Sequence, residues 1–305
     1  MIAITGYSGF VGKELLKKID VEECLLLGRQ PVAGNYKHQY FDLSNTNQSL
    51  NLSEVKVLIH CAARVHIMDD NSANSIDEFK AVNTKGTLNL ATQAAQAGVK
   101  RFIFISTIKV NGESTTGRAP FNEQENAPED PYGISKAEAE QKLLALGQKT
   151  GMEIVIIRPP LVYGEGVKAN FASLMKLVNR GFPLPFRAIN KNKRSLVSVY
   201  NLVDLIKVCV EHPNAANQVF LASDDHDLST AEMVQLMAMV QGKSNLALPV
   251  PPVLFSLVGA VLGKKQVVDR LTGSLQVDIT HTKNTLNWAP PYSVEDGFKF
   301  SAKIK

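Results

Sequence analysis

The glycine-rich turn that follows the first apolar run constrains the fold of this chain most. Residues 2–5 read IAIT, as in a buried β-strand, and GYSGFVG follows at 6–12 before the amphipathic KELLKKI. Glycines at this spacing permit a tight turn, close approach of the backbone to a phosphate, and close packing of a helix on the strand. The N-terminus of such a helix also binds anions. The segment therefore predicts a dinucleotide site that contains Gly6, Gly9, Phe10, Val11 and Gly12.

Apolar runs and amphipathic segments alternate through the first half of the chain. The pattern predicts strands at residues 1–5, 24–28, 55–62, 101–106 and 153–158, and helices at 12–19, 77–97 and 132–150. Such alternation is typical of a parallel sheet covered on both faces. We expect an α/β fold, with a Rossmann-type doubly wound sheet in residues 1–160 and a smaller, mainly substrate-binding part in 161–305. Within that second part, residues 195–212 are expected to return a strand and a helix to the core.

Composition narrows the possible partners. The 305 residues are 45% apolar and 20% charged, as in ordinary globular proteins. The net charge of +4 is small, and the basic cluster RAINKNKR at 187–194 contains no interleaved aromatic residues, which argues against nucleic acid as a partner. Three scattered cysteines and six histidines without an i, i+4 pair predict no metal site.

The most apolar segment, residues 246–263, bears on the cellular location. It spans 18 residues, but three prolines fall in its first seven. About a dozen residues remain for a helix, whereas a bilayer needs about 20. We expect a helix that is buried or faces a partner, no membrane insertion and, since the N-terminus resembles no signal segment, a cytoplasmic protein.

The second strand decides between the two nicotinamide dinucleotides. Proteins that bind NAD commonly place a carboxylate at the end of this strand, where it binds the ribose 2′-hydroxyl. Here the strand ends LGRQP at 27–31, without a carboxylate. Arg29 either accommodates a 2′-phosphate or is an ordinary surface arginine, and the first interpretation favours NADP over NAD.

Tyr132 and Lys136 stand four residues apart at the start of a predicted helix, in PYGISK. At this spacing two side chains share a helix face. A cation near the phenol, together with a positively charged nicotinamide ring, favours the phenolate and lowers the pKa of the tyrosine. The pair is then either a proton-transfer device that works beside a hydride-accepting cofactor or a packed tyrosine with a solvated lysine.

Motifs along the whole chain favour the first interpretation. The sequence resembles the extended short-chain dehydrogenase/reductase superfamily, in its NAD-dependent epimerase/dehydratase family, which acts on nucleotide sugars. The resemblance rests on the glycine spacing at 6–12, Asp42-Leu43, IHCAA at 59–63, VNTKGTLNL at 82–90, ISTIKVNG at 105–112, YGISK at 132–136, IRPPLVYG at 157–164 and KNTLNWAPPYSVEDGF at 283–298.

The resemblance assigns roles to residues at matching positions. It implies that Thr107 binds the reacting oxygen, that Tyr132 is the general acid/base, and that Lys136 holds the nicotinamide ribose. Further cofactor contacts are implied for Asp42, Leu43, Ala62, Ala63, Asn83 and Pro159. Arg158 is either a cofactor residue or part of a structural ion pair.

The substrate side of the site is also inferred from the resemblance. Asn170, Arg194 and Arg270 are implied to bind the diphosphate of a nucleotide sugar, since paired guanidinium groups suit such an anion. The alternative is that both arginines are surface charges. The apolar segment 246–263 either lines the sugar site or packs on the core.

One departure from the family pattern limits the reaction. The 4,6-dehydratases of this family carry Asp-Glu directly after the catalytic threonine, whereas Ile108-Lys109 follows Thr107. We therefore expect redox chemistry at C4 of a nucleotide sugar, as a 4-epimerase or a 4-ketoreductase, with a UDP-sugar of surface-polysaccharide synthesis as substrate. The alternative is a non-catalytic NAD(P)-binding regulatory protein. Family members often dimerise, so a homodimer is expected.

Overall fold

A parallel β-sheet organises the molecule. The computed structural model describes residues 1–65, 75–167, 169–261, 263 and 265–302. Seven described strands form the sheet in the order β3-β2-β1-β4-β5-β6-β9, with every neighbouring pair parallel. Their bounds are β1 Ile2–Thr5, β2 Cys24–Gly28, β3 Lys37–Tyr40, β4 Val57–His60, β5 Arg101–Ile105, β6 Glu153–Arg158 and β9 Gln218–Leu221.

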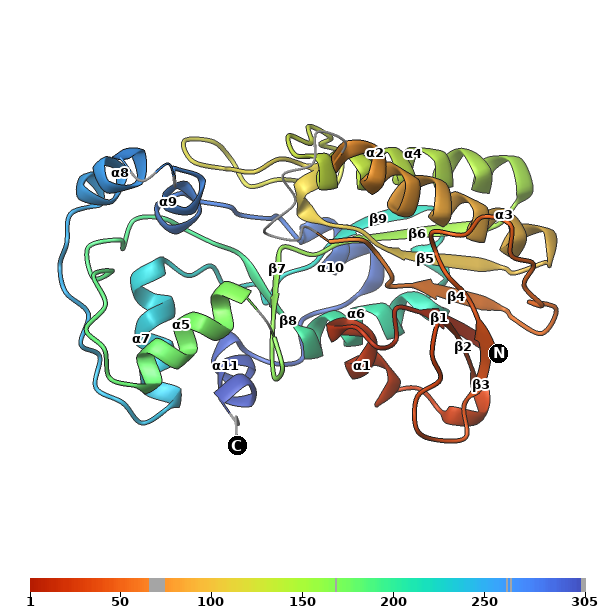
Figure 1. The fold of residues 1–305 in the computed structure, drawn as a ribbon, viewed down its shortest axis with the longest axis horizontal. Coiled ribbons are helices and arrows are strands. Elements are labelled where there is room, and N and C mark those ends of the chain that lie inside the picture. Colours follow the sequence, from red (N-terminus) through yellow and green to blue (C-terminus); the bar gives the residue numbers. More distant parts are fainter. Residues whose placement is uncertain (66–74, 168, 262, 264, 303–305) are drawn as a thin grey trace.

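Helices cover both faces of this sheet (Figure 1). One face carries α2 (Ser75–Phe79), the π-helical turn η2 (Lys80–Gly86), α3 (Thr87–Gln96) and α4 (Pro131–Thr150), which pack on one another. The opposite face carries α1 (Phe10–Leu16) and α6 (Val199–Glu211), which are also in contact. This arrangement confirms the predicted α/β, Rossmann-type doubly wound fold.

Successive side chains of a central strand point alternately into the two buried faces of the sheet, so the strand has a continuous apolar run. In β5, Phe102 and Phe104 point into the core beneath α3 and α4, whereas Ile103 and Ile105 point into the core on the α1 and α6 face. All four are buried, as in a strand covered on both sides. The carboxyl ends of the strands consequently meet at one edge of the sheet, where residues that follow them gather.

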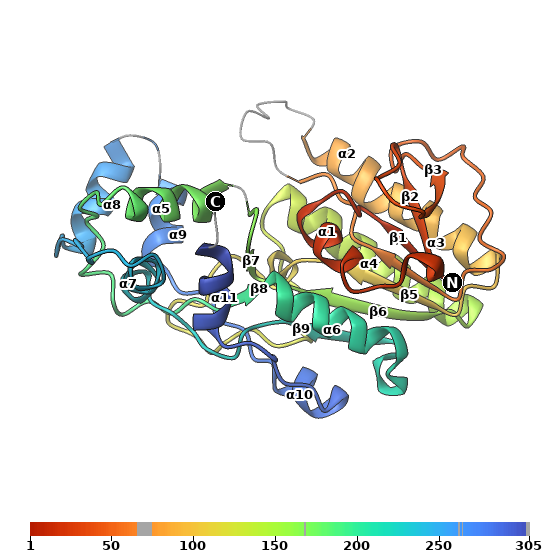
Figure 2. The same cartoon turned by 90° about the horizontal axis from the view of Figure 1, so that it is seen from below.

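The C-terminal part has its own core beside the sheet (Figures 1 and 2). Tyr163, Phe171 and Phe298 stack together there, with ring centroids 4.8–5.4 Å apart. The elements of this part are β7 Leu161–Tyr163, β8 Leu196–Ser198, α5 Ala169–Asn179, α7 Thr230–Val240, α8 Pro252–Val261, α9 Lys265–Thr272 and α11 Val294–Ala302. The helix α10 (Thr280–Leu286) packs back on β9. Short 3-10 turns complete the described elements at η1 Val21–Glu23, η3 Ile108–Val110 and η4 Pro213–Ala215.

Three details differ from the sequence expectation. Strands β3 and β9 were not predicted. The helix expected at 77–97 contains the π-helical turn η2 between α2 and α3. Residues 195–212 do bring α6 onto the sheet, but β8 pairs with β7 in a separate two-stranded sheet. The division of the chain at residue 160 stays a prediction.

Candidate active site

The glycine turn after β1 has the shape that the sequence predicted. Gly6 has φ +69°, and a Cβ there would lie 2.5 Å from the backbone nitrogen of Ala62. A Cβ at Gly12 would lie 2.2 Å from the carbonyl oxygen of Gly6, so α1 packs directly on the turn. At Gly9 a Cβ would meet only that same oxygen, at 3.1 Å. The backbone at Gly9 is thus the accessible part of the cradle, as a dinucleotide pyrophosphate requires.

The Asp42-Leu43 motif and the helix motif at 82–90 are in contact. A Cβ at Gly86 would lie 2.1 Å from the carbonyl oxygen of Leu43, so only glycine lets η2 approach this loop. The carboxylate of Asp42 accepts hydrogen bonds from the backbone and the hydroxyl of Ser44, at 3.0 and 2.7 Å. These bonds lower the pKa of Asp42, with a smaller contribution from the nearby charge of Arg29. Arg29 itself is exposed at the end of β2.

The end of β4 is fixed by a buried polar chain. The His60 ring lies 2.6 Å from the Thr5 hydroxyl and 2.9 Å from the Thr87 hydroxyl. Burial holds the pKa of His60 well below its usual value, so the ring is neutral and bonds through both nitrogens. The Ala62 backbone donates to Thr5 Oγ1 at 3.3 Å. The Ala62-Ala63 segment is therefore held beside Gly6, as expected for a cofactor-facing loop.

Asn83 uses the π-helical turn to reach two other segments. Its amide donates to the Arg64 carbonyl at 3.0 Å and to Ser135 Oγ at 3.1 Å, and its Oδ1 accepts from the Arg64 backbone at 2.8 Å. The neighbouring Thr84 hydroxyl donates to the Ser135 carbonyl at 2.8 Å. π-helical turns are frequent at functional sites. Here the turn ties the strand-end loop to α4, and the cofactor contact of Asn83 stays a prediction.

Thr107 lies two residues after the end of β5 and is the N-cap of the turn η3. Its Oγ1 accepts from the Lys109 backbone at 3.3 Å, and the following backbone N–H of Ile108 donates to the Pro159 carbonyl at 2.9 Å. The Lys109 carbonyl lies against α4, since a Cβ at Gly133 would be 2.8 Å from that oxygen. The threonine and the first turn of α4 are thereby held together.

Tyr132 lies in the first turn of α4, which Asp130 caps. The Asp130 carboxylate accepts from the Gly133 backbone at 2.7 Å and also pairs with the Lys109 ammonium. The Tyr132 ring packs edge-on against Phe79, with centroids 6.1 Å apart. Burial, and then the charge of Asp130, raise the pKa of Tyr132 to about 12.

Lys136 lies one turn further along α4 and is buried. Its ammonium donates to the Ile105 carbonyl at 2.7 Å and sits 3.9 Å from the centroid of the Phe104 ring. Burial lowers its pKa to about 7, against the opposing charges of Glu140 and Cys61. Both Lys136 and Thr107 thus lie at the carboxyl end of β5.

These values correct the electrostatic argument made from the sequence. From the sequence, Lys136 is expected to lower the pKa of Tyr132, but the pKa of Tyr132 is raised. The reason is that Lys136 is directed at the β5 carbonyl and that burial disfavours the charged form of both groups. Lys136 nevertheless reaches the carboxyl end of β5, and the turn after Thr107 packs on α4. The proton-transfer interpretation then depends on charge brought by the bound cofactor.

Arg158 belongs to a structural ion pair, one of the two alternatives left open above. Its Nη2 lies 2.6 Å from Glu140 Oε2, and both side chains are about 5% exposed or less. Its Nη1 donates to Asn111 Oδ1 at 3.0 Å and to the carbonyls of Glu123 and Glu125 at 3.2 and 2.9 Å. The guanidinium joins β6, α4 and the loop at 111–125, and this extensive bonding leaves it poorly suited to bind a cofactor.

The predicted diphosphate residues are only partly placed. The side chain of Asn170 falls outside the described residues. Arg194 Nη1 donates to the Gly273 carbonyl at 3.2 Å, and Arg270 is exposed on α9. Burial and the neighbouring charge of Arg270 lower the pKa of Arg194, and the charge of Glu113 opposes them. The charge of Arg270 is thus felt at Arg194, and the binding of a diphosphate by the two arginines stays a prediction.

Sequence reasoning missed two charged residues at this place. Glu113 lies three residues after the turn η3, and Lys109 Nζ is 3.0 Å from its Oε1. Lys109 was weighed only as a departure from the dehydratase pattern, whereas it links Glu113, Asp130 and the Thr107 turn. A spacing of i, i+4 between Lys109 and Glu113 was the available signal.

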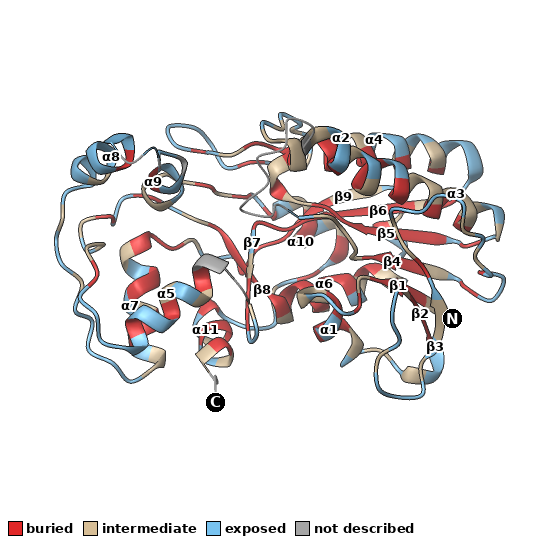
Figure 3. Cartoon of the chain, in the orientation of Figure 1, coloured by how far each residue is buried: buried red, intermediate tan, exposed pale blue. Residues whose placement is uncertain are grey.

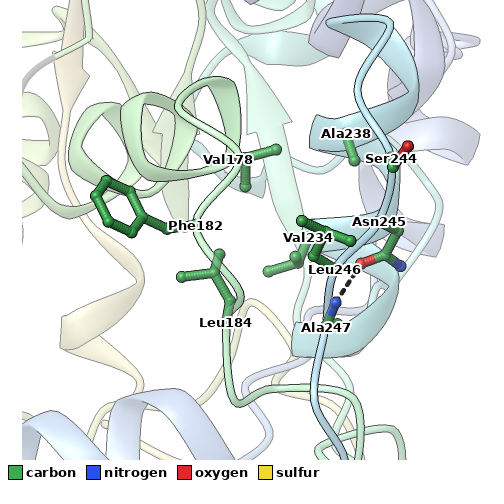
Figure 4. A pocket seen from close by; sticks show the side chains of 9 residues that line it. All are labelled: Val178, Phe182, Leu184, Val234, Ala238, Ser244, Asn245, Leu246 and Ala247. Atoms are coloured by element: carbon green, nitrogen blue, oxygen red, sulfur yellow. Dashed lines mark hydrogen bonds between the residues drawn. The ribbon is translucent and has the colours of Figure 1, made fainter.

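Hollows in the C-terminal part lie apart from these residues. One between α5, α7 and the 244–247 segment has a volume of about 10 Å³, room for about one water molecule (Figure 4). A wider one, of about 440 Å³, is bordered by Arg187, Asn190 and Gln235 among others. Neither is lined by a predicted catalytic residue.

Comparisons with known proteins identify the family of the chain. The chain is 53% identical to a UDP-glucose 4-epimerase of Vibrio cholerae, over 99% of this chain and 94% of that protein. It is 28% identical to an N-acetyl-α-D-glucosaminyl-diphospho-ditrans,octacis-undecaprenol 4-epimerase of Escherichia coli O157:H7, over 97% of this chain and 92% of that protein.

Solved structures match the fold. A UDP-glucose 4-epimerase of Thermotoga maritima with UDP-glucose superposes with a TM-score of 0.76 at 20% identity, covering 99% of this chain and 97% of that one. A UDP-glucuronic acid 4-epimerase of Bacillus cereus in complex with NAD gives 0.77 at 20% identity, with the same coverage. The model of the NAD dependent epimerase/dehydratase family matches residues 2–222. As its motifs predicted, the chain belongs to the NAD dependent epimerase/dehydratase family.

Proposed function

We propose that the protein is a nicotinamide-dependent 4-epimerase of a nucleotide sugar, with a UDP-hexose as substrate. The observation that supports this proposal is that Lys136 reaches the Ile105 carbonyl at the end of β5 and that the turn after Thr107 packs on α4, the helix that carries Tyr132. The prediction of a C4 enzyme agrees with the name of the Vibrio cholerae relative, which favours the epimerase over the ketoreductase.

The chain's own residues supply positioning and proton transfer. When bound in the glycine cradle, the cofactor supplies hydride acceptance from C4 and hydride return to it. Tyr132 exchanges the proton of the C4 oxygen, and Thr107 Oγ1 holds that oxygen by a hydrogen bond. With a pKa of about 12, Tyr132 starts protonated, and a positive charge beside it is needed to make it a base at neutral pH.

The identity of the dinucleotide rests on Arg29. Its exposed position at the end of β2 supports the prediction of NADP, because a guanidinium there can pair with a 2′-phosphate. An epimerase keeps its cofactor through the catalytic cycle, so denaturing the purified protein and measuring the mass of the released dinucleotide decides between NAD and NADP.

Activity on defined substrates tests the epimerase proposal. The protein is incubated with UDP-glucose or UDP-N-acetylglucosamine, and the C4 epimer is measured by anion-exchange chromatography. We expect epimer without continuous consumption of added cofactor, and none from Tyr132→Phe. Stoichiometric NADPH consumption with a 4-ketosugar nucleotide, without epimerisation, would establish the ketoreductase instead. Unchanged cellular function of Tyr132→Phe would support the non-catalytic alternative.

A second candidate function is 4-epimerisation of a sugar that is attached to a polyprenyl diphosphate instead of a nucleotide. The Escherichia coli relative is named for a sugar on an undecaprenyl diphosphate. Exposed aliphatic side chains of α8 lie beside α9, which carries Arg270. A polyprenyl-diphosphate sugar would place its diphosphate near Arg270 and Arg194. Comparing turnover of UDP-N-acetylglucosamine with that of the polyprenyl-diphosphate sugar in vesicles separates the two carriers.

We further propose that the protein forms a homodimer through the helices that carry Asn83 and Tyr132. In support, η2, α3 and α4 pack side by side on one face of the sheet. Sedimentation equilibrium is expected to give twice the chain mass of 33.3 kDa. A single-chain mass at micromolar concentration would contradict this proposal.

A further inference from the structure

The helix α8 exposes a continuous aliphatic stripe. Val253, Leu254, Leu257, Val258 and Val261 are 48–85% exposed (Figure 3). At 3.6 residues per turn these five positions fall within an arc of about 140° on one side of the helix. Contiguous exposed apolar surface of this kind is unusual on a monomer and marks an interaction site.

The other side of α8 is the one that packs on the protein. Phe255 stacks on Phe186, with centroids 5.9 Å apart, and Gly259 is buried. The helix is thus seated on the C-terminal part in a defined orientation, with α9 against it. Leu246 and Leu248, in the segment that leads to α8, are about half exposed and extend the apolar surface.

Positive charge borders this surface. Residues 241–268 contain three lysines and no aspartate or glutamate. Of these lysines, Lys265 is exposed at the start of α9, which contacts α8, whereas Lys243 follows the end of α7. Arg187 is also exposed, and its backbone donates to the Leu248 carbonyl at 3.1 Å. Asp269, on α9, is the first acidic residue after α8 in the sequence.

A second copy of the chain fits this surface poorly. A stable protein interface takes roughly 20–30 residues from each side, whereas α8 has 10 residues and its stripe five. A two-fold contact would also bring the same basic border of both copies together, because such interfaces pair identical surfaces. An apolar helix face bordered by lysines instead matches the acyl boundary and the anionic headgroups of a membrane.

We infer that α8 docks the protein on the surface of a membrane that contains anionic phospholipids. The aliphatic stripe enters the headgroup region, and Lys265 and Arg187 remain at the phosphates. In the described residues no helix is long and apolar enough to cross a membrane, and α8 lies along the surface. Docking places α9, which carries Arg270, close to the lipid, because α8 and α9 are in contact.

Vesicle flotation of the full chain tests this inference without reference to its activity. The vesicles are phosphatidylcholine alone or phosphatidylcholine with about one-third phosphatidylglycerol. We expect binding to the anionic vesicles, weakening several-fold between low salt and about 0.15 M salt as charges are screened. Leu257→Asp/Val258→Asp should bind on the order of tenfold more weakly or worse, because two aliphatic side chains no longer enter the lipid.

Two controls keep the test specific. The double variant must retain the circular dichroism spectrum and thermal midpoint of the wild type. Tyr40→Asp removes an equally exposed apolar side chain, 58% exposed, from the strand β3, which lies far from α8, and should leave vesicle binding unchanged. Wild-type protein that fails to float with anionic vesicles would overturn the inference. So would self-association in solution that the double variant abolishes, since a second copy would then cover α8.

Discussion

The buried pair of Arg158 and Glu140 gives the sharpest test of whether Arg158 is structural. Glu140→Gln keeps the size of the side chain and removes the charge that faces the guanidinium at 2.6 Å. It also weakens the acceptor of the Ser106 hydroxyl. Arg158→Met removes the cation and leaves Glu140 buried without its partner. Arg158→Met leaves the buried Glu140 carboxylate without its cation, and Glu140→Gln leaves the buried Arg158 guanidinium without its anion.

The expected magnitude follows from burial. Breaking a buried ion pair by removing one partner costs about 3–5 kcal/mol, because the remaining group stays desolvated. Unfolding entropy of about 2.1 cal/mol/K per residue amounts to roughly 0.6 kcal/mol/K for 305 residues. Each single variant should therefore lower the thermal midpoint by about 5–8 °C. The double variant should lose less than the sum of the two, since neither charge is then left alone.

Thermal unfolding and cofactor affinity are measured on the same proteins. Glu138→Gln is the matched control on α4, because its pair with Lys142 is partly exposed and such pairs contribute about 0–1 kcal/mol. The cofactor affinity of Arg158→Met, measured below the thermal midpoint of that variant, should stay within a few-fold of the wild-type affinity. An unchanged midpoint together with lost cofactor binding would refute the structural assignment and restore the cofactor role.

Four further variants test the site. Gly12→Ala should lower both the thermal midpoint and the cofactor affinity, since its Cβ would lie 2.2 Å from the Gly6 oxygen. Gly9→Ala should mainly weaken cofactor binding. Equal thermal midpoints for the two variants would contradict this prediction. Lys136 has a folded-state pKa lowered from 10.5 to about 7, so its unfolded form binds more protons between these values. Wild-type stability relative to Lys136→Met should then be flat below pH 7 and rise above it, by about 1.4 kcal/mol per pH unit, in urea titrations; a difference independent of pH would show that Lys136 is charged when buried. Arg29→Ser should raise the Kd for NADP and leave the Kd for NAD unchanged in fluorescence titrations. An equal change in both Kd values would contradict a contact between Arg29 and the 2′-phosphate.

Local pattern and spacing predicted much of the fold. The apolar runs of the central strands and the Gly6–Gly12 turn carry their signal within a few residues. Strand β3, with the sequence KHQY, carries no apolar alternation, because it is an edge strand that pairs with β2 alone among the described strands. The π-helical turn was missed because its cause is the set of bonds from Asn83 to Arg64 and Ser135, which a helical period does not reveal.

The site shows the same limit. The spacing of Tyr132 and Lys136 identified the pair, but the pKa of each depends on burial and on the direction of the ammonium, which only packing determines. The choice between the two roles of Arg158 required knowing that Glu140, on α4, lies against the end of β6. The burial of Tyr132 and Lys136 and the ion pair of Arg158 thus depend on residues that are distant in the sequence.

The fate of the C4 hydrogen tests the central claim most directly. The purified protein is incubated with UDP-glucose in deuterium oxide without added cofactor, and the product is examined by proton NMR. The account predicts UDP-galactose that retains protium at C4, because the hydride leaves and returns without exchanging with solvent, and no product from Tyr132→Phe. Deuterium at C4, or no epimer from UDP-hexoses under any cofactor condition, would contradict it.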